Sequence, residues 1–119
     1  MSILVAGGAG YIGAHVVRLL LQRGDEVIVV DDLSYGTPER VAGADLVELD
    51  VASGGAVDAL TDVMERRGVS AVIHFAARKQ VGESVARPAW YYQQNVGGLA
   101  NMLLAMEGPG VGQMIFSSS

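Results

Sequence analysis

A glycine-rich segment near the start of the chain has the composition of a phosphate-binding turn. Residues 7–13 read Gly-Gly-Ala-Gly-Tyr-Ile-Gly and contain two overlapping spacings, Gly8-x-Gly10-x-x-Gly13 and Gly7-x-x-Gly10-x-x-Gly13. An apolar run precedes them and a helix-like segment follows, which is the context typical of a dinucleotide-binding loop. The glycines allow a tight turn and let a pyrophosphate approach the backbone closely. The helix N-terminus supplies free amides and partial positive charge.

An acidic residue after the second apolar run adds to this motif. Asp31 follows Val27–Val30, at the distance where a carboxylate accepts hydrogen bonds from an adenosine ribose. Capping of a strand end is the less favoured alternative. Asp31 would repel a 2′-phosphate, Asp32 adds a second negative charge, and residues 31–36 contain no arginine or lysine. The expected cofactor is therefore NAD and not NADP.

Three later segments are candidates for the same site, and each has a structural alternative. Asp50 can reach an adenine edge or can simply form a turn. The small residues in Phe75-Ala76-Ala77 allow close approach of a cofactor, or equally of a helix. Lys79 is suited to bind the nicotinamide ribose or the phosphates, but a solvated surface lysine is an equal alternative.

The histidines and paired tyrosines are less suited to chemistry. His15 and His74 have no partner at metal-ligand spacing, so a packed or locally bonded ring is favoured for both. Tyr91 and Tyr92 are not followed by lysine at the Tyr-x-x-x-Lys spacing of a short-chain dehydrogenase base. We assign no catalytic role to either tyrosine.

The pattern of apolar runs predicts an α/β fold that brings these candidates together. Five strand-like runs are expected, at Ile3–Ala6, Val27–Val30, Asp45–Leu49, Ala71–Phe75 and Gln113–Ser117. Helical patterns lie between them, at about Tyr11–Arg23, Gly55–Arg67 and Pro88–Glu107, with a loop or broken helix at 34–43. Right-handed crossovers then give a Rossmann-like, doubly wound parallel sheet of order 3-2-1-4-5. Its cleft lies beyond strands one and four, where the order reverses.

Composition is consistent with one globular domain. The chain has 119 residues, of which 50% are hydrophobic and 18% charged, with a net charge of −5 and no cysteine. This balance disfavours nucleic-acid and anionic-membrane partners and excludes disulfides and thiolate metal sites. Without an apparent signal segment or membrane span, the expected location is cytoplasmic.

Five segments of the sequence closely resemble those of a known protein family. The segments that carry the resemblance are residues 7–13, Asp31-Asp32-Leu33-Ser34, residues 74–84, residues 91–98 and Phe116-Ser117-Ser118-Ser119. They are similar to the UDP-galactose 4-epimerases, also called UDP-glucose 4-epimerases, NAD-dependent members of the extended short-chain dehydrogenase/reductase superfamily. The Val81-Gly82-Glu83-Ser84 block is specific to these epimerases and close relatives.

The resemblance implies a set of cofactor contacts. It assigns the glycine loop to the pyrophosphate, residues 31–36 to the adenosine ribose, Asp50-Val51 to the adenine and residues 75–79 to the nicotinamide side. The implied cofactor-binding residues are Gly7, Gly10, Tyr11, Ile12, Gly13, Asp31, Asp32, Leu33, Ser34, Tyr35, Gly36, Asp50, Val51, Phe75, Ala76, Ala77, Lys79, Gln94 and Ser117. Three positions depart from the family, which usually has asparagine in place of Asp32, glycine in place of Ala77 and an apolar residue in place of Arg78.

The resemblance also implies what the sequence lacks. Ser119 matches a serine that orients the substrate, but no residue matches the Tyr-x-x-x-Lys base or the nucleotide-sugar domain. We therefore expect residues 1–119 to be a truncated, N-terminal NAD-binding portion that binds NAD without epimerising a sugar. The alternatives are one piece of an active epimerase completed by a separate chain, and a non-catalytic interaction protein of the same fold.

Truncation has an expected consequence for assembly. The fifth strand becomes a sheet edge and the Pro88–Glu107 helix lacks a neighbour, so apolar surface is left exposed. We predict a homodimer formed through Trp90, Leu99, Met102, Leu103 and Met106. A UDP-sugar partner is expected only if the missing half is supplied.

Overall fold

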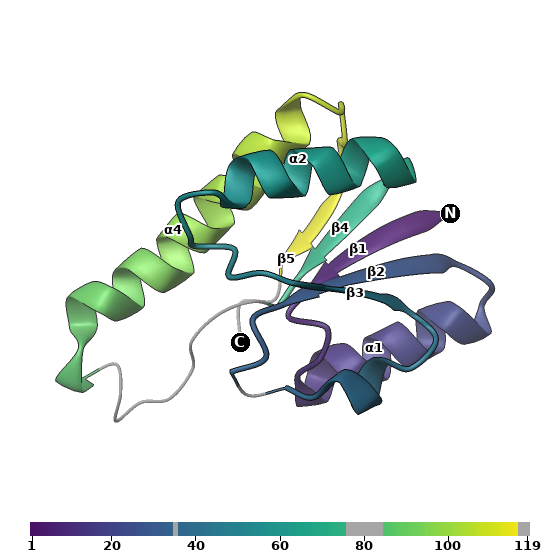
Figure 1. The fold of residues 1–119 in the computed structure, drawn as a ribbon, viewed down its shortest axis with the longest axis horizontal. Coiled ribbons are helices and arrows are strands. Elements are labelled where there is room, and N and C mark those ends of the chain that lie inside the picture. Colours follow the sequence, from purple (N-terminus) through teal and green to yellow (C-terminus); the bar gives the residue numbers. More distant parts are fainter. Residues whose placement is uncertain (35, 76–84, 117–119) are drawn as a thin grey trace.

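A parallel sheet covered by helices on both faces forms the molecule (Figure 1). The computed structural model describes residues 1–34, 36–75 and 85–116. The strands are β1 (Ser2–Ala6), β2 (Glu26–Asp31), β3 (Asp45–Glu48), β4 (Ala71–His74) and β5 (Met114–Phe116). The helices are α1 (Tyr11–Gln22), α2 (Ala56–Arg67) and α4 (Pro88–Glu107), with a short 3₁₀ helix, η1 (Pro38–Val41), between β2 and β3.

The strand order confirms the topology expected from the sequence. The five described strands lie in the order β3-β2-β1-β4-β5, and every pairing is parallel. In the registers of β1 with its two neighbours, Ile3 lies opposite Val27 on one side and Ala71 on the other. The order reverses between β1 and β4, and because the two strands are parallel their carboxyl ends lie at the same end of the sheet.

The expected element boundaries agree with the observed ones within one or two residues. Helix α1 ends at Gln22 and not at Arg23, and α4 spans Pro88–Glu107 as predicted. The expected broken helix at 34–43 is the single 3₁₀ turn η1, which begins at Pro38 because proline fixes a helical φ without needing an N–H partner.

Two apolar layers explain why the strand sequences do not alternate between apolar and polar residues. Leu4 and Ile28 face a cluster that includes Leu60 of α2 and Met102 of α4. The alternate residues of the same strands face a second cluster, built around Val17 of α1. Because helices cover both faces, β1 is buried along its whole length.

Burial of α4 corrects part of the surface expected for a dimer. Met102 is fully buried and Met106 nearly so, because both side chains pack in the cluster between α4, α2 and the sheet. Leu103 and Leu104 are instead about half exposed, at 48% and 52%. Helical periodicity was not enough to distinguish the inner stripe of α4 from its outer stripe, since apolar residues occur on both.

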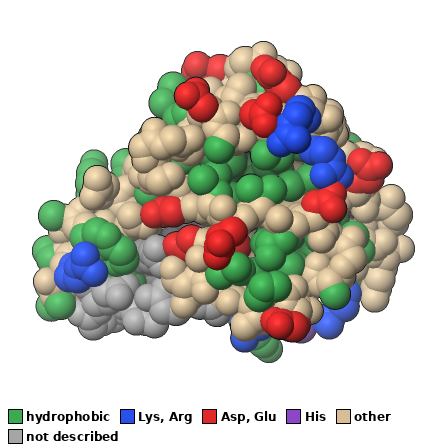
Figure 2. All heavy atoms as spheres, viewed as in Figure 1, with side chains coloured by type: hydrophobic (Ala, Val, Ile, Leu, Met, Phe, Trp, Pro, Cys, Tyr) green, Lys and Arg blue, Asp and Glu red, His purple; other side chains and the backbone are tan. Residues whose placement is uncertain are grey.

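Acidic side chains are scattered over the face seen in Figure 2, and basic ones occupy a few separate places. This distribution accords with the net charge of −5. Within residues 1–34, 36–75 and 85–116, none of the helices has the length and apolarity needed to cross a membrane.

Candidate functional site

The glycine loop connects β1 to α1 at the end of the sheet where the strand order reverses. Gly7 has a φ of +80°, a left-handed conformation that a side chain disfavours, and its amide donates to the carbonyl of Val30. A Cβ on Gly13 would lie 2.4 Å from the Gly7 carbonyl oxygen and 2.8 Å from the Gly8 Cα. Gly13 therefore lets α1 pack directly against the loop.

Gly8 and Gly10 have different environments within the same loop. A Cβ on Gly8 would lie 2.9 Å from the side chain of Val29, so this glycine is required by packing between loop and sheet. Among the described residues, a Cβ on Gly10 would meet only the Gly7 oxygen, at 3.5 Å, which is an ordinary van der Waals contact. Packing within the described structure thus does not require glycine at position 10, and the space beside it is open.

The N-terminus of α1 presents backbone amides that no side chain caps, next to the open space beside Gly10. Gly10 is its N-cap, no side chain caps the helix, and its first turn contains no acidic residue. The first bond of the helix runs from the Ala14 amide to the Gly10 carbonyl, at 2.9 Å. The preceding amides, of Tyr11 to Gly13, come before the helical ladder and are available to an anion.

Asp31 holds the glycine loop and the loop after β2 together. Its Oδ2 accepts a hydrogen bond from the Ala9 amide at 3.0 Å, and its Oδ1 accepts one from the Leu33 amide at 2.7 Å. The residue is only 9% exposed. An ionised carboxylate has about four acceptor positions, so each oxygen retains one for a ligand.

The segment that follows Asp31 folds back onto the glycine loop. Leu33 has a φ of +62°, and the bond from its amide to Asp31 supports this conformation. The Ser34 amide donates to Asp32 Oδ1 at 3.0 Å. A Cβ on Gly36 would lie 2.5 Å from the Ala9 carbonyl oxygen, so the two loops are in direct backbone contact.

The turn after β3 begins next to Asp31, because the Leu49 amide donates to the Asp31 carbonyl at 3.0 Å. The Asp50 carbonyl accepts from the Ser53 amide, and Asp50 Oδ1 accepts from the Ala52 amide, both at 2.9 Å. Asp50 therefore forms a turn, the structural alternative considered from sequence. Its role at an adenine edge stays a prediction, as Oδ2 is compatible with a further bond.

Helix α4 contacts this turn, which sequence reasoning missed. Asn101 Nδ2 donates to the Val51 carbonyl at 2.8 Å and lies 3.4 Å from that of Ser53. The available signal was a lone amide between apolar residues, with Leu99 and Met102 nearby in the sequence. The Ala9 amide was also missed, because a backbone group leaves no signal in residue type.

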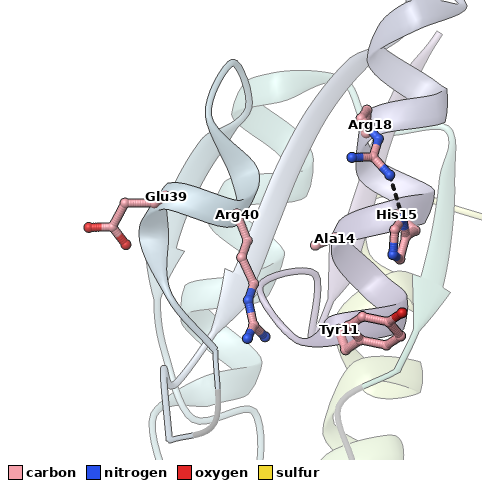
Figure 3. A pocket seen from close by; sticks show the side chains of 6 residues that line it. All are labelled: Tyr11, Ala14, His15, Arg18, Glu39 and Arg40. Carbon is pink, nitrogen blue, oxygen red and sulfur yellow. Dashed lines mark hydrogen bonds between the residues drawn. The ribbon is translucent and has the colours of Figure 1, made fainter.

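A shallow pocket of about 300 Å³ lies beside the glycine loop, between α1 and η1 (Figure 3). Arg18 and His15 of α1 are hydrogen-bonded to each other, and the His15 ring meets Tyr11 edge-on at 5.0 Å. Arg40 extends from η1 toward the pocket, whereas Glu39 points away from it. The local bond of His15 agrees with the interpretation favoured from sequence.

The remaining candidate residues that the structure describes lie on or next to β4 and on α4. His74 is buried and stacks on Phe116, with the ring centroids 5.8 Å apart. Phe75 is half-buried and its amide donates to the Ala6 carbonyl, which places it at the cleft end of β4. Gln94 is half-buried on α4. No group of three or more potential metal ligands gathers in the part of the chain that the structure describes.

Several predicted contacts lie outside the described residues. They are Tyr35, Ala76, Ala77, Lys79, Ser117 and Ser119, together with the Val81–Ser84 block. Their roles stay predictions.

Comparison with known proteins gives consistent matches along the whole chain. A UDP-glucose 4-epimerase of Erwinia amylovora is 47% identical over 124 residues, covering 100% of this chain and 37% of the relative. One of Klebsiella pneumoniae is 42% identical and is covered over 89% of its own length. The crystal structure of UDP-glucose 4-epimerase from Brucella ovis in complex with NAD superposes with a TM-score of 0.91 at 44% identity, over 98% of this chain and 35% of that one.

The chain thus spans little more than a third of the length of most of these relatives. A family model described as the NAD dependent epimerase/dehydratase family matches residues 3–119. With the strand order, the glycine loop and the Asp31 contacts, this match establishes that the chain belongs to the NAD-dependent epimerase/dehydratase family.

Proposed function

We propose that this chain is an NAD-binding unit, with the pyrophosphate at the glycine loop and the adenosine ribose at Asp31. The observation that carries the proposal is the pairing of an uncapped helix N-terminus with a carboxylate fixed on the same loop. The amides at that end of α1 favour the negative pyrophosphate, and the retained acceptor positions of Asp31 suit ribose hydroxyls.

The residues present fit this cofactor. Among the described residues, a Cβ on Gly10 would meet only the Gly7 oxygen, at 3.5 Å, so these residues leave the space beside Gly10 open for the pyrophosphate. The negative charges of Asp31 and Asp32 oppose a 2′-phosphate, which supports NAD over NADP. Structural relatives from Brucella ovis and Thermus thermophilus were crystallised in complex with NAD, which supports the same choice.

Titration of the purified protein with NAD tests the proposal, with Gly10→Ala as the informative variant. Gly10 has a φ of −74° and a ψ of 178°, which alanine adopts without strain, so the variant should fold. The added methyl group would occupy the space proposed for the pyrophosphate. We expect NAD affinity to fall on the order of tenfold or more, because the phosphates are displaced from the amides.

The matched control is Gly112→Ala, where a Cβ would meet nothing within 4 Å and which lies at the other end of β5 from the cleft. It should bind NAD as the unaltered protein does. An unaltered protein that binds no NAD, or a Gly10→Ala variant of unchanged affinity, would contradict the proposed site.

For the whole protein we propose epimerisation of a UDP-sugar, as in the relatives that carry that name. NAD would accept and return a hydride in such a reaction. The residues of this chain would bind and orient the cofactor, and Ser119 would orient the sugar hydroxyl. Since the sequence contains no Tyr-x-x-x-Lys pair, we propose that the general base comes from outside these 119 residues.

Incubation with NAD and UDP-galactose separates this proposal from the NAD-binding one. We expect these 119 residues alone to bind NAD and to form no UDP-glucose above the blank. Product formed by this chain alone would show that another residue provides the base.

A further inference from the structure

The turn at residues 50–53 has little support from the sheet. It follows β3, which is the edge strand of the described sheet and pairs with β2 only. The residues of β3 are half-buried or exposed, unlike those of β1. The bonds within the turn, from the Ala52 and Ser53 amides to Asp50, define its shape but not its position relative to the cleft.

Helix α4 supplies that position through two residues one turn apart. A Cβ on Gly98 would lie 3.0 Å from Val51 Cγ2, so this glycine lets the helix approach the turn closely. Three residues later, on the same face, Asn101 donates its amide to the Val51 carbonyl at 2.8 Å. The Val51 side chain is 5% exposed and packs in the cluster that contains Met102. The turn is therefore fixed by a side-chain bond and by packing, both from α4.

We infer that Asn101 is a positioning residue for the adenine end of the nucleotide site, acting through the Val51 carbonyl. The inference rests on the proposed function, in which Asp50 and Val51 meet the adenine. Asn101 itself faces the inner side of the turn and bonds backbone oxygens, so it need not touch the cofactor. Its bond keeps the Asp50 carboxylate at a fixed distance from the glycine loop, and adenine recognition depends on that distance.

The test compares two ligands on the purified protein and its variants. One is NAD, and the other is nicotinamide hypoxanthine dinucleotide. In this analogue an oxygen replaces the 6-amino group that would donate a hydrogen bond to the Asp50 carboxylate. We expect the unaltered protein to prefer NAD, because the analogue leaves the carboxylate without its donor. Asn101→Leu removes the amide at similar volume. It should weaken NAD binding by about tenfold and bring the preference for NAD close to one, because the turn is no longer fixed.

A second readout does not depend on cofactor. Hydrogen exchange of the Ala52 and Ser53 amides in the ligand-free protein should be faster in Asn101→Leu, since their turn opens more often. Asn101→Gln keeps the amide and should recover part of both effects. Asn101→Ser is a smaller change for use if Asn101→Leu does not fold.

Thr61→Val is the matched control for a general loss of stability. It removes hydroxyl bonds to the Val57 and Ala105 carbonyls in the same α2–α4 interface, away from the turn. This variant should keep the preference for NAD. An Asn101→Leu protein that binds NAD with an unchanged preference and unchanged exchange would overturn the inference alone. An unaltered protein that binds no NAD would overturn the proposed function and this inference together.

Discussion

At the scale of single residues, the Asp31 carboxylate has a structural role and a proposed role in ligand binding. It binds the Ala9 and Leu33 amides, which fixes the glycine loop and the following segment relative to each other. In the proposed function it would also accept hydrogen bonds from the adenosine ribose. A substitution at Asp31 therefore changes the shape of the empty site as well as its contacts with a ligand, and the two effects need separate measurements.

Asp31→Ala should weaken NAD binding by about 1–3 kcal/mol and lower the free energy of unfolding by a similar amount. The second effect arises because the buried Ala9 amide loses its acceptor. Calorimetry measures the binding, and urea denaturation measures the unfolding. Asp32→Ala is the control, because Asp32 bonds an exposed amide, and its unfolding free energy should change by less than about 0.5 kcal/mol. Equal stability of the two variants would show that Asp31 has no structural task.

Gly13→Ala should destabilise the protein by about 1–3 kcal/mol or more, because its Cβ would overlap backbone atoms that cannot move without shifting the loop or α1. Gly10→Ala should change the free energy of unfolding by less than about 1 kcal/mol, since its Cβ would meet only one atom, at 3.5 Å. Thermal or urea unfolding of both variants checks this difference. Similar stabilities would mean that α1 does not pack against the loop as closely as described.

At the scale of elements, α4 connects the core to the edge of the site. Its inner face packs against α2 and the sheet, and its segment 98–101 supports the turn after β3. The glycine at position 98 is explained by this close approach. The adjacent Gly97 is not, since a Cβ there would meet nothing within 4 Å.

These neighbouring glycines should respond differently to alanine. Gly97→Ala should stabilise the protein by about 0.5–1 kcal/mol, because alanine costs less backbone entropy in a helix. Gly98→Ala should gain less or destabilise, because its Cβ would press on Val51 at 3.0 Å. Denaturant unfolding of the two variants measures the difference. A gain at position 98 as large as that at position 97 would argue against tight contact between α4 and the turn.

At the scale of the whole molecule, several of the exposed apolar side chains lie on α4 and β5. Val96, Leu103 and Leu104 of α4 are about half exposed, and Ile115 of the edge strand β5 is 66% exposed. Exposed apolar side chains favour association. We retain the expectation of a homodimer, with these residues replacing the buried Met102 and Met106.

Sedimentation equilibrium at micromolar concentration should therefore detect a dimer. The double variant Leu103→Lys and Leu104→Lys should weaken self-association by at least about tenfold, because it places charges in the apolar interface. Leu19→Lys is the control on another helix, since Leu19 is an exposed leucine on α1, at 63%. A monomeric unaltered protein, or an equal effect of Leu19→Lys, would remove α4 from the interface.

The sequence by itself determined the sheet order, the element boundaries and the position of the glycine loop and Asp31. These features depend on local signals, namely apolar runs, turn glycines and an acid at a fixed distance, and short crossovers leave few other topologies. Only the tertiary structure decided which face of α4 is buried, that Asp31 binds Ala9, and that Asn101 supports the turn after β3. The last two contacts join residues 22 and 50 positions apart, and in each a side chain bonds a backbone amide or carbonyl whose position residue type does not reveal, so the sequence cannot identify the partner.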